Sequence, residues 1–166
     1  MCSIPSLFPR VGYTVPMRIL LQRVSRASVS VDRHDIGSIG RGYLLFLGVM
    51  QGDTQEQASW LAHKIASLRL FDGEDGKVND RNLLDIGGEA LVVSQFTLAG
   101  DFAKGNRPDY TAAADPANAI PLYEYFIDAL RREGIGKVAC GSFGAMMEVS
   151  LVNDGPVTLW LERVSG

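Results

Sequence analysis

The stretch Ala90–Leu98, which reads ALVVSQFTL, and the stretch Asn153–Thr158, which reads NDGPVT, decide the fold expected for this chain. In the first, hydroxyl and amide residues follow directly on a short apolar run. The second separates two mostly apolar runs, Val149–Val152 and Leu159–Leu161. Short apolar runs bounded by such residues are typical of β-strands. Each stretch is therefore predicted to mark a place where a strand gives way to a loop.

The remaining strands follow from the same pattern. Arg18–Val24 and Ala27–Asp32 predict two strands, and in the second valines alternate with serines. Tyr43–Val49 is apolar throughout, which indicates a strand buried on both faces of its sheet. Further strands are predicted at Ala90–Thr97, Val138–Cys140, Met146–Val152 and Val157–Val164.

Two helices are predicted from apolar residues at helical spacing. The first runs from Thr54 to about Leu70, with Asp53 as its N-cap and Glu56 at the capping-box position. The second begins with Asp115 as its cap and Pro116 in its first turn. The sequence thus predicts a compact single α/β domain with bent mixed β-sheets and two main helices.

The composition excludes several classes of protein. The formal charge of −3 and the pI of about 5.3 argue against a general polyanion binder, which is usually basic. Cys2 and Cys140 form no disulfide framework, and with two histidines in the chain no metal site and no cofactor are predicted. No apolar run approaches the roughly 18 residues of a membrane span. Residues 1–16 contain three prolines and are predicted to be a disordered extension before a domain at 17–166, in a cytoplasmic protein.

Ser94 and Thr97 invite the hypothesis of a nucleophile at the end of a strand. A hydroxyl needs a base to take its proton, and His34 and His63 stand in a polar turn and inside a helix. The alternative is that both hydroxyls only cap the strand end. A third possibility is that backbone N–H groups left unpaired there stabilise an oxyanion.

Gly155–Pro156 is the second candidate site. Asp-Gly between apolar strands usually signals a simple hairpin. The proline that follows weakens this interpretation, because a bond before proline adopts the cis form at a cost of only about 0.5–1 kcal/mol. A cis bond would present two rigid backbone carbonyls with no side chain at Gly155.

The two stretches, in this order, resemble the D-aminoacyl-tRNA deacylase family, and the resemblance runs from Met17 to Val164. It implies hydrolysis of the ester of D-aminoacyl-tRNA and of mischarged glycyl-tRNA, with rejection of L-aminoacyl-tRNA. It also implies a symmetric homodimer with active sites at the interface that bind the 3′ end of the tRNA. Two rivals are a small serine-type esterase that uses Ser94 and a non-enzymatic nucleic-acid-associated module.

The resemblance also assigns roles to residues. It places catalysis at Ser94, Gln95, Phe96 and Thr97, with the amides of Phe96 and Thr97 polarising the substrate carbonyl. It implies a cis Gly155–Pro156 that reaches into the partner's pocket, is braced by Arg23 and holds the substrate amino group. Met147 would line the pocket of the terminal adenosine, whereas Met146 stands where the family has an aspartate. From their loop, Lys104 and Arg107 are candidates for phosphate contacts.

Overall fold

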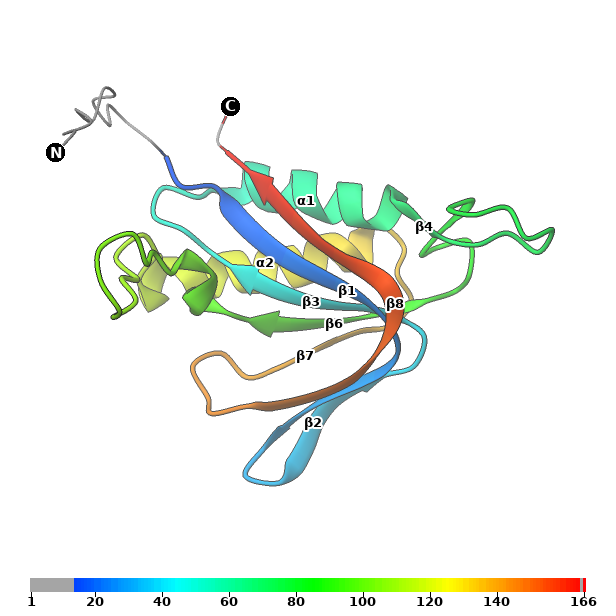
Figure 1. The fold of residues 1–166 in the computed structure, drawn as a ribbon, viewed down its shortest axis with the longest axis horizontal. Helices are drawn as coiled ribbons and strands as arrows, with labels where there is room; N and C mark the ends of the chain where they lie inside the picture. Colours follow the sequence, from blue (N-terminus) through cyan, green and yellow to red (C-terminus); the bar gives the residue numbers. More distant parts are fainter. Residues whose placement is uncertain (1–13, 165) are drawn as a thin grey trace, which may run out of the picture.

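The computed structural model describes residues 14–164 and 166, and residues 1–13 of the expected extension lie outside the described residues. Two helices lie on one side of a strongly bent sheet, and a small two-stranded sheet projects from one end (Figure 1). The strands are β1 (Met17–Val31), β2 (His34–Ile39), β3 (Gly42–Gly48), β4 (Arg69–Phe71), β5 (Arg81–Asn82), β6 (Glu89–Ser94), β7 (Val138–Cys140) and β8 (Glu148–Arg163). The helices are α1 (Gln55–Ser67), the 3-10 helix η1 (Phe96–Ala99) and α2 (Pro116–Arg132).

Two long strands carry the bend of the sheet. β1 pairs with β3 along Arg18–Val24 and then with β2 along Ala27–Val31, so it changes partner halfway. β8 pairs antiparallel with β1 along both halves. The prediction of two strands in each region is therefore wrong, because each pair forms one continuous strand. The expected breaks fall where the register of β1 and β8 shifts, between Gln22 and Arg26.

The sheet has the order β2-β1-β3-β6-β7, with β8 on the other edge of β1. β3 and β6 are parallel in the centre, and alternate residues of both face opposite sides. Leu45 and Val92 pack under the helices, whereas Leu44 and Leu91 pack against the bent halves of β1 and β2. The sheet thus folds over itself and encloses apolar cores on both faces, as the continuous apolar sequence of β3 predicted.

The first turn of α1 differs from the prediction. Thr54 is the N-cap, and its capping-box partner is Gln57. Asp53 is not the cap because its carboxylate turns back and accepts a hydrogen bond of 2.6 Å from the Met50 N–H. The helix ends at Ser67 because Arg69 and the residues after it pair with β5. By contrast, α2 starts at Pro116 with Asp115 as its cap, which confirms the prediction.

His34, which the sequence placed in a polar turn, instead opens β2, and β2 pairs with the end of β1. Within the described part of the chain, neither α1 nor α2 has the length and apolarity needed to cross a membrane. The domain boundary at residue 16 stays a prediction. Thr14–Pro16 run irregularly into β1, and Pro16 is buried.

Candidate functional site

A mostly apolar cavity of about 470 Å³ opens where β6 ends. Its walls come from the ends of β3 and β6, from η1, from α2 and from the turn between β7 and β8. The lining residues used below are Ser94, Gln95, Phe96, Thr97, Tyr123, Phe143, Met146 and Met147. The structure therefore brings the four residues predicted to be catalytic together with Met147. The four residues and Met147 share one cavity although 50 to 53 positions separate them in the sequence.

The backbone after β6 leaves hydrogen-bond donors unused at this cavity. β6 ends at Ser94, not at Thr97 as predicted, because the chain turns into η1 at Phe96. The Gln95 N–H still donates to the Leu47 carbonyl of β3 at 2.7 Å. Since the first N–H groups of a helix lack intrahelical acceptors, those of Phe96 and Thr97 have no acceptor among the described backbone groups.

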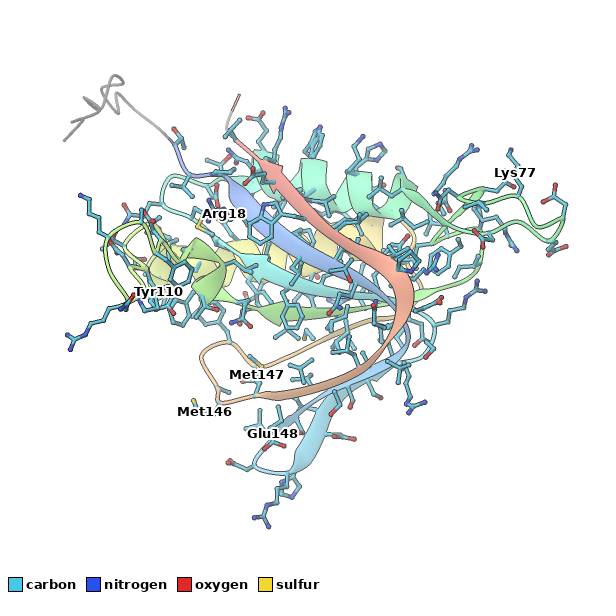
Figure 2. The ribbon with its side chains drawn as sticks, in the orientation of Figure 1. Arg18, Lys77, Tyr110, Met146, Met147 and Glu148 are labelled. Atoms are coloured by element: carbon cyan, nitrogen blue, oxygen red, sulfur yellow. The ribbon has the colours of Figure 1, made fainter. Side chains whose placement is uncertain are left out.

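The position of η1 is fixed from a distance by Arg18 of β1. One guanidinium nitrogen of Arg18 donates to the Leu98 carbonyl at 2.7 Å, and another lies 3.6 Å from Glu162 of β8. Figure 2 shows Arg18 near the start of β1. No local pattern of residues indicated this contact, because Arg18 and Leu98 are 80 positions apart.

The side chains at the cavity do not form a nucleophile with a base. The amide nitrogen of Gln95 donates to the hydroxyl of Thr97. His63 lies on the helix surface, where its Nδ1 is 3.1 Å from Glu133, and the Nδ1 of His34 is 2.8 Å from the Asp32 carbonyl. Neither histidine lines the cavity, so the esterase that uses Ser94 lacks its base.

Tyr123 of α2 forms part of the cavity wall, a role that sequence reasoning missed. Its hydroxyl lies 3.1 Å from the Val92 carbonyl and 3.2 Å from the Gly141 carbonyl, so it ties the end of β6 to the chain after β7. Burial, and to a lesser extent Cys140, raises the pKa of Tyr123. The hydroxyl therefore stays neutral and acts as a donor that positions the wall.

The opposite wall carries the two methionines. Met147 is partly buried and packs beside Gly141, where a Cβ would come within 2.6 Å of its sulfur. Met146 is 91 % exposed, so its side chain points largely into solvent. Figure 2 shows both methionines on the turn between β7 and β8, on the same side of the molecule as Tyr110. Met147 is thus placed to contact a ligand in the cavity.

Gly155 and Pro156 lie on a large bulge of β8. Gln22 pairs with Thr158 and Val24 pairs with Asn153, so four residues of β8 stand opposite Arg23 alone. Both are exposed, and the bond between them is cis, as the resemblance implied. The hairpin interpretation is wrong, because the strand continues with the same partner after the bulge.

Arg23 holds this bulge, in the manner that the resemblance implied. Its guanidinium donates to the carbonyls of Asp154 at 3.2 Å and Gly155 at 3.3 Å, and also to the Leu70 carbonyl. It forms an ion pair of 3.1 Å with the Asp154 carboxylate. Since a planar guanidinium donates in several fixed directions, the single side chain of Arg23 can hold the bulge against β1 and also contact β4.

Asn153 closes the base of the bulge, a role that sequence reasoning missed. Its side-chain nitrogen donates to the Arg23 carbonyl at 3.0 Å and to the Val157 carbonyl at 3.2 Å. Asparagine before Asp-Gly-Pro was a turn signal, but its partners depend on the pairing of β8 with β1. Within one chain the bulge is separate from the cavity, because neither Gly155 nor Pro156 lines it.

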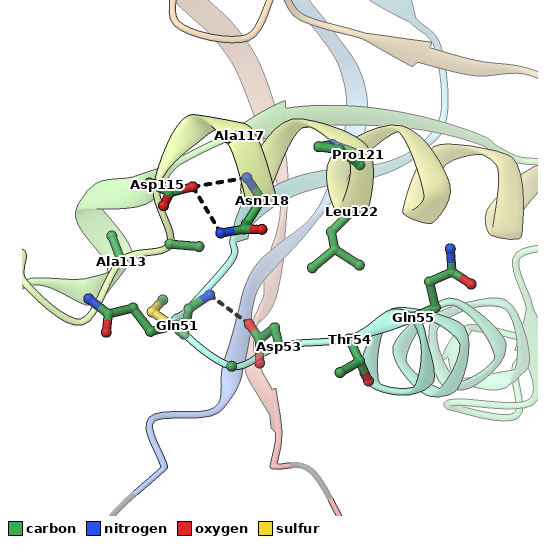
Figure 3. Close-up of a pocket in the computed structure, with 13 residues that line it drawn as sticks. Gln51, Asp53, Thr54, Gln55, Ala113, Asp115, Ala117, Asn118, Pro121 and Leu122 are labelled. Carbon is green, nitrogen blue, oxygen red and sulfur yellow. Dashed lines mark hydrogen bonds between the residues drawn. The ribbon is translucent and has the colours of Figure 1, made fainter.

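A larger cavity of about 860 Å³ lies between the first turns of α1 and α2 (Figure 3). Its polar groups serve their own backbone: Asp115 accepts two hydrogen bonds of 3.0 Å from Asn118, and Asp53 accepts one from Met50. Burial raises the pKa of Asp53 to about 6, against the hydrogen bonds from the N–H groups of Met50 and Met17. Asp115 thus caps α2, whereas Asp53 binds the backbone that precedes α1, and among the described residues neither carboxylate is a base paired with a nucleophile.

In residues 14–164 and 166, no group of three or more His, Cys, Asp or Glu side chains is placed to hold a metal ion. The arrangement instead offers an apolar cavity, unused backbone donors and an arginine-braced bulge. Such a site suits the cleavage of an ester that is already activated.

Comparison with known proteins identifies the kind of ester. The family model described as D-Tyr-tRNA(Tyr) deacylase matches residues 20–162. The D-aminoacyl-tRNA deacylase of Thermomicrobium roseum is 58 % identical over 146 residues, which cover 88 % of this chain and 94 % of that protein. The D-aminoacyl-tRNA deacylase of Thermus aquaticus is 53 % identical, with 88 % and 95 % covered.

Solved structures share the fold. One described as c-Myc DNA Unwinding Element Binding Protein superimposes with a TM-score of 0.84 at 41 % identity, covering 90 % of this chain and all of that one. A probable eukaryotic D-amino acid tRNA deacylase, 16 % identical, shares the fold with a TM-score of 0.76. The sequence matches place the chain among ester hydrolases. It belongs to the D-aminoacyl-tRNA deacylase family.

Proposed function

We propose that the chain hydrolyses the ester of D-aminoacyl-tRNA with backbone N–H groups as its main catalytic donors. The observation that carries this proposal is the pair of unused N–H groups of Phe96 and Thr97 at the cavity where β6 ends. Donors of this kind are effective when they are fixed before the reaction. The contact of Arg18 with Leu98 supplies that rigidity.

The reaction needs little more than these donors. The oxygen of a water molecule attacks the ester carbonyl, negative charge develops on the carbonyl oxygen, and the bond to the ribose oxygen then breaks. One proton of the water ends on that ribose oxygen, and the other leaves with the released acid, which loses it to solvent at neutral pH. The resemblance implies that the neighbouring ribose hydroxyl assists, and no protein nucleophile is then required. The apolar wall that includes Phe143 and Met147 would hold the terminal adenosine.

We further propose that the bulge of one subunit completes the site of a second subunit in a symmetric homodimer. The exposed Gly155 and Pro156 lie outside the cavity of their own chain, and Arg23 and Asn153 hold them in a fixed shape. Inserted into the partner's cavity, the carbonyls there would hold the substrate amino group. They would leave no space for the Cβ of an L-amino acid, so D-amino acids and glycine would be accepted.

The tRNA beyond its 3′ end would meet Lys104 and Arg107. Both are exposed on the loop after η1, and neither forms an ion pair with a residue that the structure describes. Two phosphate contacts would give a modest dependence on salt. We assign this activity to a domain at residues 17–166 and to the cytoplasm, where aminoacylated tRNA serves translation.

Deacylation of paired D- and L-tyrosyl-tRNA by the purified protein tests this function. We expect rapid release of D-tyrosine, together with hydrolysis of glycyl-tRNA, and no release of L-tyrosine above the rate without protein. Fast hydrolysis of L-tyrosyl-tRNA would contradict chiral rejection at Gly155–Pro156. Light scattering at assay concentration tests the dimer, and a monomer with full activity would contradict insertion of the bulge into a partner.

A further inference from the structure

The loop that follows η1 is a built structure beside the cavity. Asp101 and Asp109 exchange two backbone hydrogen bonds of 2.9 Å, which close the loop between them. The Asp101 carboxylate accepts from the Ala103 N–H at 2.9 Å, and that of Asp109 accepts from the Thr111 N–H at 2.8 Å. Hydrogen bonds from Thr111, and to a smaller degree the charge of the nearby Lys104, lower the pKa of Asp109. The two ends of the loop are therefore held in a fixed position.

Three aromatic rings gather where the two ends of the loop meet. The rings of Phe96 and Tyr110 meet edge to face, with 5.3 Å between their centroids. Phe102 and Tyr110 both reach Gly100, where a Cβ would lie 3.3 Å from each ring. We call Phe96, Phe102 and Tyr110 the aromatic shelf. Because Phe96 also lines the cavity, the shelf begins at the rim of the candidate active site.

Two rings of the shelf are exposed to solvent, whereas Tyr110 is half-buried. Phe96 is 56 % exposed and Phe102 is 65 % exposed. A single exposed apolar side chain needs no explanation, but adjacent exposed aromatic rings beside a cavity mark a binding surface. The same loop carries the exposed cations Lys104 and Arg107. Aromatic rings next to cations are the combination that binds single-stranded nucleic acid, by stacking of bases and by contact with phosphates.

We propose that the aromatic shelf stacks on the base of the penultimate nucleotide of the tRNA, next to the terminal adenosine. This inference rests on the proposed function, in which the cavity holds that adenosine. The acceptor end of tRNA is unpaired, so the cytosine before the adenosine can leave its neighbours and lie on a ring. The cations then contact the phosphates that flank it. The acidic chain thus uses a local surface, and its net charge of −3 does not oppose binding.

The test combines a protein change with an RNA change. Phe102 is the residue to vary, because it is exposed and does not line the cavity. The substrates are D-tyrosyl-tRNA with cytosine or with an abasic nucleotide at the penultimate position. On the normal substrate, Phe102→Ala is expected to raise KM about five- to hundredfold with kcat unchanged, the range found for loss of one base–aromatic stack. Phe102→Trp should restore KM because it keeps a stacking face.

On the abasic substrate, the wild type should show the same rise in KM, and Phe102→Ala should add nothing further. Val78→Ala is the matched control, since Val78 is 69 % exposed and lies outside the cavity, and it should behave like the wild type on both RNAs. Equal effects of Phe102→Ala on both substrates, or no effect on either, would overturn the stacking proposal. Failure of the wild type to cleave normal D-tyrosyl-tRNA would instead overturn the proposed function.

Discussion

Replacement of Gly155 by alanine separates the role of the bulge in function from its role in folding. A Cβ built at Gly155 finds open space in its own chain, with the Asn153 side-chain oxygen at 3.8 Å as its nearest neighbour. The backbone at Gly155 does not have the positive φ that disfavours side chains. Nothing in the part of the chain that the structure describes therefore requires glycine at this position.

The expected effect on stability follows from this open space. Glycine-to-alanine changes at compatible positions stabilise by about 0.4–1 kcal/mol, because the unfolded chain loses freedom. For a chain of 166 residues this raises the melting temperature by about 1–4 °C. Catalysis should respond in the opposite direction. The added methyl group would stand on the part of the bulge that approaches the substrate, and it would push the substrate aside. A misplacement of about 1 Å lowers the rate roughly a hundredfold.

We therefore expect Gly155→Ala to melt no lower than the wild type and to lose about a hundredfold or more in kcat/KM on D-tyrosyl-tRNA. Gly136→Ala is the control, since its Cβ meets nothing within 4 Å and it lies outside the cavity. It should show the same small stabilisation and full activity. Activity of Gly155→Ala within about threefold of the wild type would refute the claim that Gly155 lies next to the bound substrate. A clearly lower melting temperature of Gly155→Ala would refute the claim that the folded protein has room for a Cβ at this position.

Three further predictions test other parts of the site. Ser94→Ala and Thr97→Ala should keep most activity because the backbone donors remain. Phe96→Pro removes a donor and should lower kcat about a hundred- to thousandfold, provided that circular dichroism shows a folded protein. A comparable loss in Ser94→Ala would indicate a side-chain nucleophile. Deacylation should survive prolonged EDTA treatment, since no metal-ligand cluster occurs in the described residues, and abolished turnover restored by a metal would contradict this. The pKa of Asp53 is raised to about 6, so the folded state keeps a proton that the unfolded state loses near pH 4; stability should fall by about 1 kcal/mol, after allowance for solvent screening, as the pH rises from 4 to 6. Asp53→Asn should remove this slope in thermal unfolding, and an unchanged slope would assign it to other groups.

Local sequence predicted those elements that depend on neighbouring residues. The Asp115 cap with Pro116 after it fixed the start of α2, and the continuous apolar residues of β3 indicated its central place in the sheet. Prediction from local sequence failed where contacts with other parts of the chain decide the conformation. His34–Ile39 contains polar residues and a glycine, yet it forms a strand because the end of β1 offers it a ladder of hydrogen bonds. The choice between Asp53 and Thr54 as N-cap depended on where the Asp53 carboxylate turns, which its spacing does not show.

The sequence by itself determined the family, the chemistry available after β6 and the Gly-Pro pair, because these reside in contiguous residues. Only the tertiary structure decided how they are arranged. Tyr123 and Met147 reach the cavity through the packing of α2 and the turn before β8, and Arg23 meets Gly155 across 132 positions of the chain. It also placed the bulge away from the cavity of its own chain. The physical reason is that pairing of β1 with β8 closes a loop of more than a hundred residues, and its register depends on contacts that no local pattern contains.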